Sequence, residues 1–153
     1  MIIVPTPEEG SPRLPGSCGG NNCDLDADET HRILVVDDDE SLRDLMVETL
    51  KPERYEVDVA SSCQDALPLI LFRDYCGILL DIILPDANGM SLFRQIARRR
   101  PEMRPRVIFI SGAMGQDEAD RISKLMRNRV LLKPFRIEEL IAAIHQVDNR
   151  VLR

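Results

Sequence analysis

From residue 31 onward, the sequence alternates five times between a short apolar run and an amphipathic stretch. The apolar runs are 33–36, 55–59, 78–83, 107–110 and 130–132. Continuous apolar runs of strand length are typical of strands that are buried on both faces of a sheet. Strand followed by helix, five times over, predicts an α/β fold, a doubly wound parallel sheet of five strands with helices on both faces and right-handed crossovers.

The stretches between the runs carry apolar residues at helical spacing. They are Leu42, Leu45, Met46 and Leu50, then Ala119, Ile122, Leu125 and Met126, and finally Ile137, Leu140, Ile141 and Ile144. The second helix begins with Ser62 and Asp65 in the spacing of a capping box, and Pro68 should bend that helix or remove one hydrogen bond. The third helix is expected over 89–100, ended by Pro101.

The first 29 residues differ in composition from the rest of the chain and are rich in proline and glycine. We expect residues 1–29 to form a flexible extension or linker and residues 30–150 to form the one folded domain that 153 residues allow. Cys18 and Cys23 form a C-x4-C pair, but without a second cysteine pair they read better as free thiols than as a zinc site. Cys63 and Cys76 are interpreted as small side chains that fill space in the core or near the surface.

Charge and hydropathy exclude several classes of protein. A net charge of −6 disfavours direct nucleic-acid binding, and the run of arginines at 98–100 lies where a helix should end and cations complement its dipole. No apolar run approaches the ~20 residues that cross a bilayer, so no membrane insertion is expected. The start of the chain lacks the basic and apolar regions of a secretory signal, which favours a cytoplasmic location.

Polar side chains follow four of the five predicted strands. Acidic residues 37–39 follow the first strand, Asp81 lies in the third, Ser111 follows the fourth and Lys133 follows the fifth. In an open parallel sheet, ligands bind in the crevice at the carboxyl ends of the strands. We therefore expect these side chains to share one site, with the second strand at an edge of the sheet.

Gathered carboxylates repel one another, by about 3 kcal/mol per pair at ~5 Å and an effective dielectric constant of 20. A hard divalent cation compensates such a cluster, and Mg²⁺ takes one or two carboxylates together with waters and phosphate oxygens. The alternative is that the acids only cap the first helix, and we adopt that interpretation for Asp39 and Glu40. Lys133 can carry its positive charge into the same crevice.

Four sequence motifs, in order and with the proper spacing, resemble the response-regulator receiver family of two-component systems. They read ILVVDD at 33–38, LLDIILP at 79–85, FISG at 109–112 and LKPF at 132–135, and the resemblance covers residues 31–149. Arg43, five residues after Asp38, supports the register. The resemblance implies a CheY-like, flavodoxin-like sheet with strand order 2-1-3-4-5.

The resemblance also implies residue roles. Asp81 is the expected phosphoacceptor, which takes a phosphoryl group from a histidine kinase or a phosphotransfer protein and passes the signal to a downstream protein. Asp37, Asp38, Asp81 and the backbone carbonyl of Ile83 are the expected Mg²⁺ ligands, with Asp38 in the most direct contact.

Two further residues complete the expected catalytic set around Asp81. By the resemblance, Ser111 hydrogen-bonds a phosphoryl oxygen, and Lys133 pairs with the phosphoryl group from beside a cis Lys133–Pro134 bond. The domain is then not an enzyme in the usual sense but a signalling receiver that promotes its own phosphorylation and dephosphorylation.

The sequence departs from many relatives at two places. Val130 stands where they keep an aromatic residue whose rotation reports phosphorylation, so we expect signalling through Ser111, the loop after it and the helix near 119–126. Ile83 and Ala113 are apolar at positions that can orient an attacking water. We therefore expect slow self-dephosphorylation.

Three other interpretations remain. A phosphatase with an aspartyl nucleophile needs a second acid two residues after Asp81, where Ile83 stands. A pseudo-receiver that only binds partners is disfavoured because every residue needed for phosphoryl transfer is present. The motifs also resemble receivers fused behind sensor histidine kinases, in which case residues 1–29 would be an interdomain linker.

Overall fold

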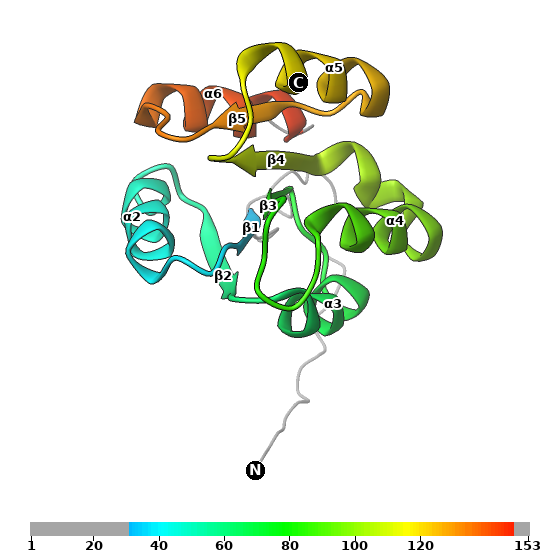
Figure 1. The fold of residues 1–153 in the computed structure, drawn as a ribbon. Coiled ribbons are helices and arrows are strands. Elements are labelled where there is room, and N and C mark those ends of the chain that lie inside the picture. The colour runs from blue at the N-terminus through cyan, green and yellow to red at the C-terminus, as the bar shows by residue number, and fades with distance from the viewer. Residues whose placement is uncertain (1–30, 149–153) are drawn as a thin grey trace, which may run out of the picture. The chain divides into compact units, whose positions relative to one another are not determined.

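Residues 31–148 are described in the structure, which is a computed structural model (Figure 1). The five strands are β1 (Arg32–Val36), β2 (Glu56–Ala60), β3 (Gly77–Asp81), β4 (Val107–Ser111) and β5 (Val130–Leu132). The helices are α2 (Glu40–Leu50), α3 (Cys63–Phe72), α4 (Gly89–Arg99), α5 (Gln116–Met126) and α6 (Ile137–Val147), with a 3-10 helix η3 (Pro101–Arg106). The predicted extension over 1–29 and the pair Cys18 and Cys23 lie outside the described residues.

The five strands form one parallel sheet in the order β2-β1-β3-β4-β5. This confirms the predicted fold class and strand order, with β2 at one edge and β5 at the other. In the register, Val36 pairs with Ala60 on one side and with Leu80 on the other, while Asp81 pairs with Ile110. The carboxyl ends of the strands therefore lie level with one another, on one side of the sheet across the strand direction.

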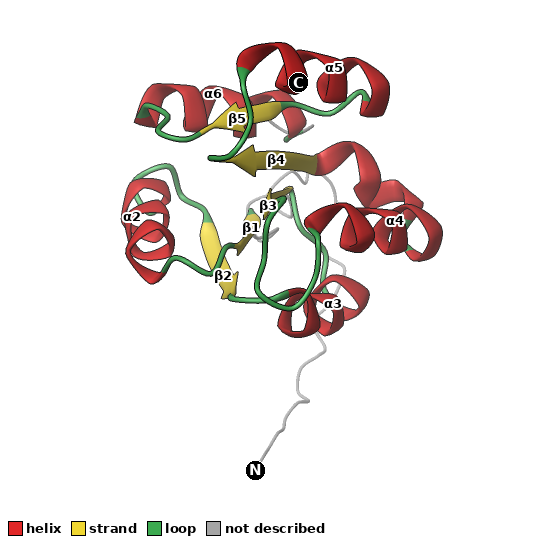
Figure 2. Cartoon of the chain, in the orientation of Figure 1, coloured by secondary structure: helices red, strands yellow, loops and turns green. Residues whose placement is uncertain are grey.

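Helices cover both faces of the sheet, as Figure 2 shows with helices in red around strands in yellow. On one face, α3, α4 and α5 pack over alternate strand residues that include Leu34, Ile78 and Phe109. On the other face, α2 and α6 pack over Ile33 and Leu79. Each central strand is buried along both faces, which is why these runs are continuously apolar.

Several strand boundaries differ by one or two residues from the predicted ones. The third strand ends at Asp81 rather than at residue 83, because the side chain of Asp81 accepts a hydrogen bond from Ile83 N (3.0 Å) and turns the chain away from the sheet. Ile83 then bridges antiparallel to Asn88. The second strand is shifted by one residue, since it spans Glu56–Ala60 and the prediction was 55–59.

The helix boundaries follow the expected capping residues. Asp39 caps α2 and Ser62 caps α3 through their side chains, and α3 continues through Pro68. The helix predicted over 89–100 is α4, which ends at Arg99 with Arg100 as its C-cap, close to the predicted boundary. Arg100 binds Asp74 and backbone carbonyls at the end of α3.

The two cysteines within the described residues, Cys63 and Cys76, are buried, in agreement with the first of the two predicted positions, the core. Among residues 31–148, no helix combines the length and the apolar character that spanning a membrane requires.

Candidate functional site

The carboxyl ends of four strands carry the predicted site residues, and the side chains of Asp37, Asp81 and Lys133 meet there. Asp37 follows β1, Asp81 ends β3, Ser111 ends β4 and Lys133 follows β5. The parallel register brings together residues that lie up to 96 positions apart in the chain (Asp37 to Lys133). Ser111 and Lys133 are joined directly, because Lys133 N donates to Ser111 O (2.8 Å).

Asp37 is fully buried and fixed by backbone contacts. Its N–H donates to Ala60 O on β2 (3.1 Å), and its Oδ1 accepts from Asp39 N (2.9 Å). Arg43 on α2 donates from Nη1 to Asp37 O (2.7 Å), which ties α2 to the end of β1. The carboxylate of Asp37 is therefore held in place before any ligand arrives.

Asp81 is buried as well, and two groups bind its carboxylate. Ile83 N donates to Oδ1 (3.0 Å) and Lys133 Nζ donates to Oδ2 (3.1 Å). Behind it, Gly89 at the start of α4 comes so close that a Cβ there would lie 2.2 Å from Asp81 O. Glycine at position 89 thus lets the helix pack directly against the backbone of the candidate phosphoacceptor.

Lys133 lies between the two buried carboxylates. Its Nζ is 3.0 Å from Asp37 Oδ2 and 3.1 Å from Asp81 Oδ2. The peptide bond to Pro134 is cis, as the resemblance implied. Gly112 lies beside the stem of Lys133, where an added Cβ would be 3.4 Å from Cδ. The ammonium group is thereby directed into the crevice rather than into solvent.

The charges of this cluster do not balance, because one ammonium faces two buried carboxylates. Burial raises the pKa of Asp81, and the negative charge of Asp37 raises it further, against the opposing effects of Ile83 N and Lys133. Burial alone would lower the pKa of Lys133, but its interactions with Asp37 and Asp81 outweigh that effect and raise it. The cluster therefore carries excess negative charge.

Asp38 adds a third carboxylate to this excess. Single oxygens of Asp37, Asp38 and Asp81 lie within 4.8 Å of one another, and Asp38 is exposed where the other two are buried. Asp37 Oδ2 is buried, and its ion-pair partner is Lys133 Nζ at 3.0 Å, which is shared with Asp81. An all-oxygen donor set with uncompensated negative charge fits a hard divalent cation such as Mg²⁺.

The remaining predicted residues border the cluster. Ser111 is buried, and its Oγ accepts from Ala113 N (3.2 Å), which orients the hydroxyl at the end of β4. Ile83 lies in the loop after β3, where its residue is 59% exposed and its N–H binds Asp81. The metal role of the Ile83 carbonyl stays a prediction.

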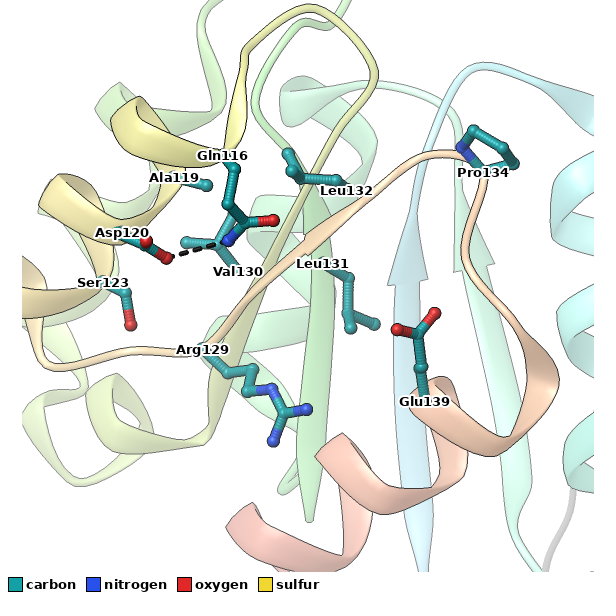
Figure 3. A pocket seen from close by; sticks show the side chains of 10 residues that line it. All are labelled: Gln116, Ala119, Asp120, Ser123, Arg129, Val130, Leu131, Leu132, Pro134 and Glu139. Carbon is teal, nitrogen blue, oxygen red and sulfur yellow. Dashed lines mark hydrogen bonds between the residues drawn. The ribbon is translucent and has the colours of Figure 1, made fainter.

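A separate pocket of about 440 Å³ lies between α5 and β5 (Figure 3). Figure 3 shows Gln116 and Asp120, joined by a hydrogen bond of 2.8 Å, on α5 beside Val130 of β5. Val130, at the position where an aromatic residue would signal, is half-buried against this pocket. The residues of the acidic cluster do not line this pocket.

Sequence reasoning missed two residues that shape the site. Asp86 accepts hydrogen bonds from Cys63 N (3.0 Å) and Gln64 N (2.9 Å), so the loop after Asp81 is tied to the start of α3. These backbone contacts lower the pKa of Asp86. Gly89 is the other, and its only sequence signal is a glycine at a helix start eight residues after Asp81.

Comparisons with known proteins show the family of this chain. The family model described as the response regulator receiver domain matches residues 33–145. Response regulator ArlR of Staphylococcus saprophyticus is 33% identical over 121 residues, which are 78% of this chain and 53% of ArlR. The chain thus spans about half the length of the curated relatives it matches.

Solved structures show the same fold. A CheY-like response regulator receiver domain protein from Methanospirillum hungatei is 27% identical, with a TM-score of 0.71 over 81% of this chain and 98% of that one. The non-phosphorylated HemR receiver domain from Leptospira biflexa is 28% identical, with a TM-score of 0.67 over 77% and 94%. The chain therefore belongs to the response regulator receiver family.

Proposed function

We propose that this domain is the phosphoacceptor of a two-component phosphorelay and that Asp81 receives the phosphoryl group. The observation that carries the proposal is the pairing of a buried Asp81 carboxylate with Lys133 Nζ at 3.1 Å, beside two more carboxylates. One buried nucleophile, one positive charge and an oxygen-rich cation site are the parts that phosphoryl transfer to a carboxylate requires.

The transfer is a direct displacement at phosphorus. An oxygen of Asp81 attacks the phosphoryl group of a phosphohistidine on a kinase or phosphotransfer protein, the bond from phosphorus to the imidazole nitrogen breaks, and the freed imidazole takes a proton. Lys133 balances charge on the equatorial oxygens, and Ser111 donates its hydroxyl to one of them. The product is an acyl phosphate on Asp81.

We assign the cation site to Asp37, Asp38 and Asp81, with the Ile83 carbonyl as a fourth ligand. A bound Mg²⁺ would neutralise the excess carboxylate charge and would supply positive charge for phosphoryl oxygens beside Asp81. Asp37 contributes a rigid buried oxygen, whereas the exposed Asp38 can adjust its position.

We further propose that the phosphorylated domain loses its phosphoryl group slowly. Ile83 and Ala113 place no polar side chain beside Asp81 to orient a water molecule. We expect the phosphorylated domain, freed of phosphodonor, to remain modified for many minutes in the presence of Mg²⁺. A half-life of seconds would contradict the assignment of these two positions, and introducing Ile83→Asn with Ala113→Glu should shorten it.

A partner-binding pseudo-receiver is the second candidate, and the intact set of Asp81, Lys133 and Ser111 weighs against it. Whether the domain acts alone or within a longer protein, such as a hybrid kinase, does not change the chemistry of the site. In either setting we propose signalling through the loop after Ser111 and through α5, because Val130 provides no aromatic switch.

Labelling with a small phosphodonor tests the proposal. We expect acetyl phosphate with Mg²⁺ to add one phosphoryl group per chain, and chelation of Mg²⁺ or Asp81→Asn to abolish the addition. Asp117→Asn, which changes an exposed acid on α5, is the matched control and should be labelled like the parent. Equal labelling of the Asp81→Asn variant would overturn the proposal.

A further inference from the structure

A second cluster of metal-ligating side chains lies at the opposite end of the strands, where β1 and β3 begin. His31, Cys76 and Asp148 each offer one ligand atom, and these three atoms lie within 4.8 Å of one another. His31 and Cys76 stand immediately before β1 and β3, whereas Asp37 and Asp81 stand at the far ends of those strands. We propose that His31, Cys76 and Asp148 form a zinc site, independent of the phosphoacceptor site.

The backbone of the cluster is fixed by the fold. His31 O accepts from Glu56 N (2.8 Å), which joins it to β2, and Cys76 N donates to a carbonyl of β1 (2.7 Å). Asp148 caps α6, with its N–H donating to Ile144 O (2.9 Å). Three separate segments are thereby held at one point, so metal binding requires side-chain adjustment rather than refolding.

The distances suit a tetrahedral ion. His31 Nδ1 and Asp148 Oδ2 are 3.3 Å apart. Zinc bonds of 2.0–2.2 Å to nitrogen and oxygen place two such ligands about 3.4 Å apart in a tetrahedron, and a sulfur ligand at 2.3 Å lies about 3.6 Å from either. Bringing Cys76 Sγ from within 4.8 Å to that separation needs a contraction of at most about 1.2 Å, within reach of a side-chain rotation.

The donor types select the metal. Imidazole, thiolate and carboxylate are the ligands that zinc takes in proteins, and a thiolate with a carboxylate supplies two negative charges for one divalent ion. The all-oxygen cluster around Asp81 favours magnesium instead. The cluster at the carboxyl ends of the strands and the cluster at their amino ends therefore prefer different metals.

A neighbouring residue supports the carboxylate in the way that metal ligands are usually supported. Tyr55 OH donates to Asp148 Oδ2 (2.9 Å), and the Tyr55 ring packs edge-on against His31 with centroids 5.9 Å apart. Such outer hydrogen bonds orient ligating groups and commonly matter to metal affinity. The side chain of His31 is 34% exposed, which leaves an entry path for the ion.

Zinc at this place would join the segment before β1 to the segment after α6, the two ends of the described domain. Because the ion binds the folded arrangement of residues from distant parts of the chain, it should stabilise the fold by mass action. The effect should not depend on phosphorylation of Asp81.

Cobalt is the probe that tests the site, because a thiolate bound to Co²⁺ gives a charge-transfer band that carboxylate ligands do not give. The test uses the full chain with Cys18→Ser and Cys23→Ser, so that Cys63 and Cys76 are the remaining thiols. We expect Co²⁺ to produce the thiolate band together with the visible bands of a tetrahedral ion, and Zn²⁺ to displace it.

Variants locate the ligands. Cys76→Ser should remove the thiolate band, whereas Cys63→Ser, the matched buried cysteine, should keep it. His31→Ala changes a partly exposed side chain and should fold, so it decides the matter if Cys76→Ser does not. We expect it to weaken Zn²⁺ binding by more than about tenfold, since losing even an outer partner costs 10–100-fold.

Separate outcomes distinguish this site from the phosphoacceptor site. Asp38→Ala should lose the response to Mg²⁺ yet keep the cobalt spectrum and Zn²⁺ affinity. Absence of a thiolate band in the parent, or unchanged Zn²⁺ affinity in His31→Ala, would show that the cluster is only a hydrogen-bonded contact between the ends of the domain and would overturn the proposal.

Discussion

Replacing Lys133 with methionine isolates the charge imbalance at the acidic site, because methionine keeps most of the apolar stem and removes the ammonium. In the parent, Nζ lies 3.0 Å from Asp37 Oδ2 and 3.1 Å from Asp81 Oδ2. At an effective dielectric constant of 20, these two attractions sum to about 11 kcal/mol before the cost of desolvating the ammonium. That cost is several kcal/mol, and the side chain of Lys133 is 25% exposed, which screens the attraction further.

The net effect is therefore smaller than the gross attraction. Breaking a buried ion pair by removing one partner typically costs 3–5 kcal/mol, and partial exposure places Lys133→Met at the lower end, about 3 kcal/mol. Two buried carboxylates would then face each other without a cation. Adding Asp81→Asn removes one of them and should restore on the order of 2 kcal/mol, since the repulsion is about 3 kcal/mol at ~5 Å.

Urea unfolding followed by far-ultraviolet circular dichroism measures these differences, because the chain has no tryptophan to report by fluorescence. The solution should contain a chelator to remove divalent cations. Lys124→Met, at an exposed lysine on α5, is the matched control and should change the free energy of unfolding by less than about 0.5 kcal/mol. A Lys133→Met variant as stable as the parent, or one that Asp81→Asn destabilises further, would refute the reasoning.

Three further predictions concern the same site. Mg²⁺ should raise the melting temperature, by the equivalent of about 2.7 kcal/mol at one hundred times its Kd, and Asp38→Ala should remove most of that rise in a thermal scan. Gly89→Ala should destabilise the domain by about 2 kcal/mol and slow labelling, because its Cβ would meet Asp81 O at 2.2 Å; equal unfolding midpoints would contradict the close packing. Since the pKa of Lys133 is raised above its ordinary 10.5, its stabilisation is complete below that pH and lost as pH rises through the higher folded-state pKa. Unfolding curves should therefore show an alkaline loss of stability that Lys133→Met reduces.

The sequence predicted the fold well because the signals it uses are local. Apolar runs and helical spacing gave five strands and five helices, and the strand–helix order gave the parallel sheet. The largest error lies where a hydrogen bond to a side chain ends a strand before its apolar run ends. Residues 82 and 83 are apolar like the strand before them, but the hydrogen bond from Ile83 N to Asp81 ends the strand there.

The candidate site was predictable in composition but not in geometry. Strand ends identified Asp37, Asp81, Ser111 and Lys133, and the structure places them together. Nothing local in the sequence shows that Asp37 is buried while Asp38 is exposed, since both follow the same strand.

Contacts between distant segments were beyond sequence reasoning altogether. The pairing of His31 with Asp148, 117 positions later, depends on where α6 ends relative to β1. Asp86, in the loop between β3 and α4, is a similar case, because its partners Cys63 and Gln64 at the start of α3 are more than twenty positions away.

The most direct test of the phosphoacceptor assignment is to locate the modified residue chemically. After treatment with acetyl phosphate and Mg²⁺, borohydride reduction converts an aspartyl phosphate to homoserine, which peptide mass spectrometry can place in the chain. Our account predicts homoserine at position 81 and nowhere else. Conversion at Asp37 or Asp38, or a reduced product that does not depend on Mg²⁺, would contradict it.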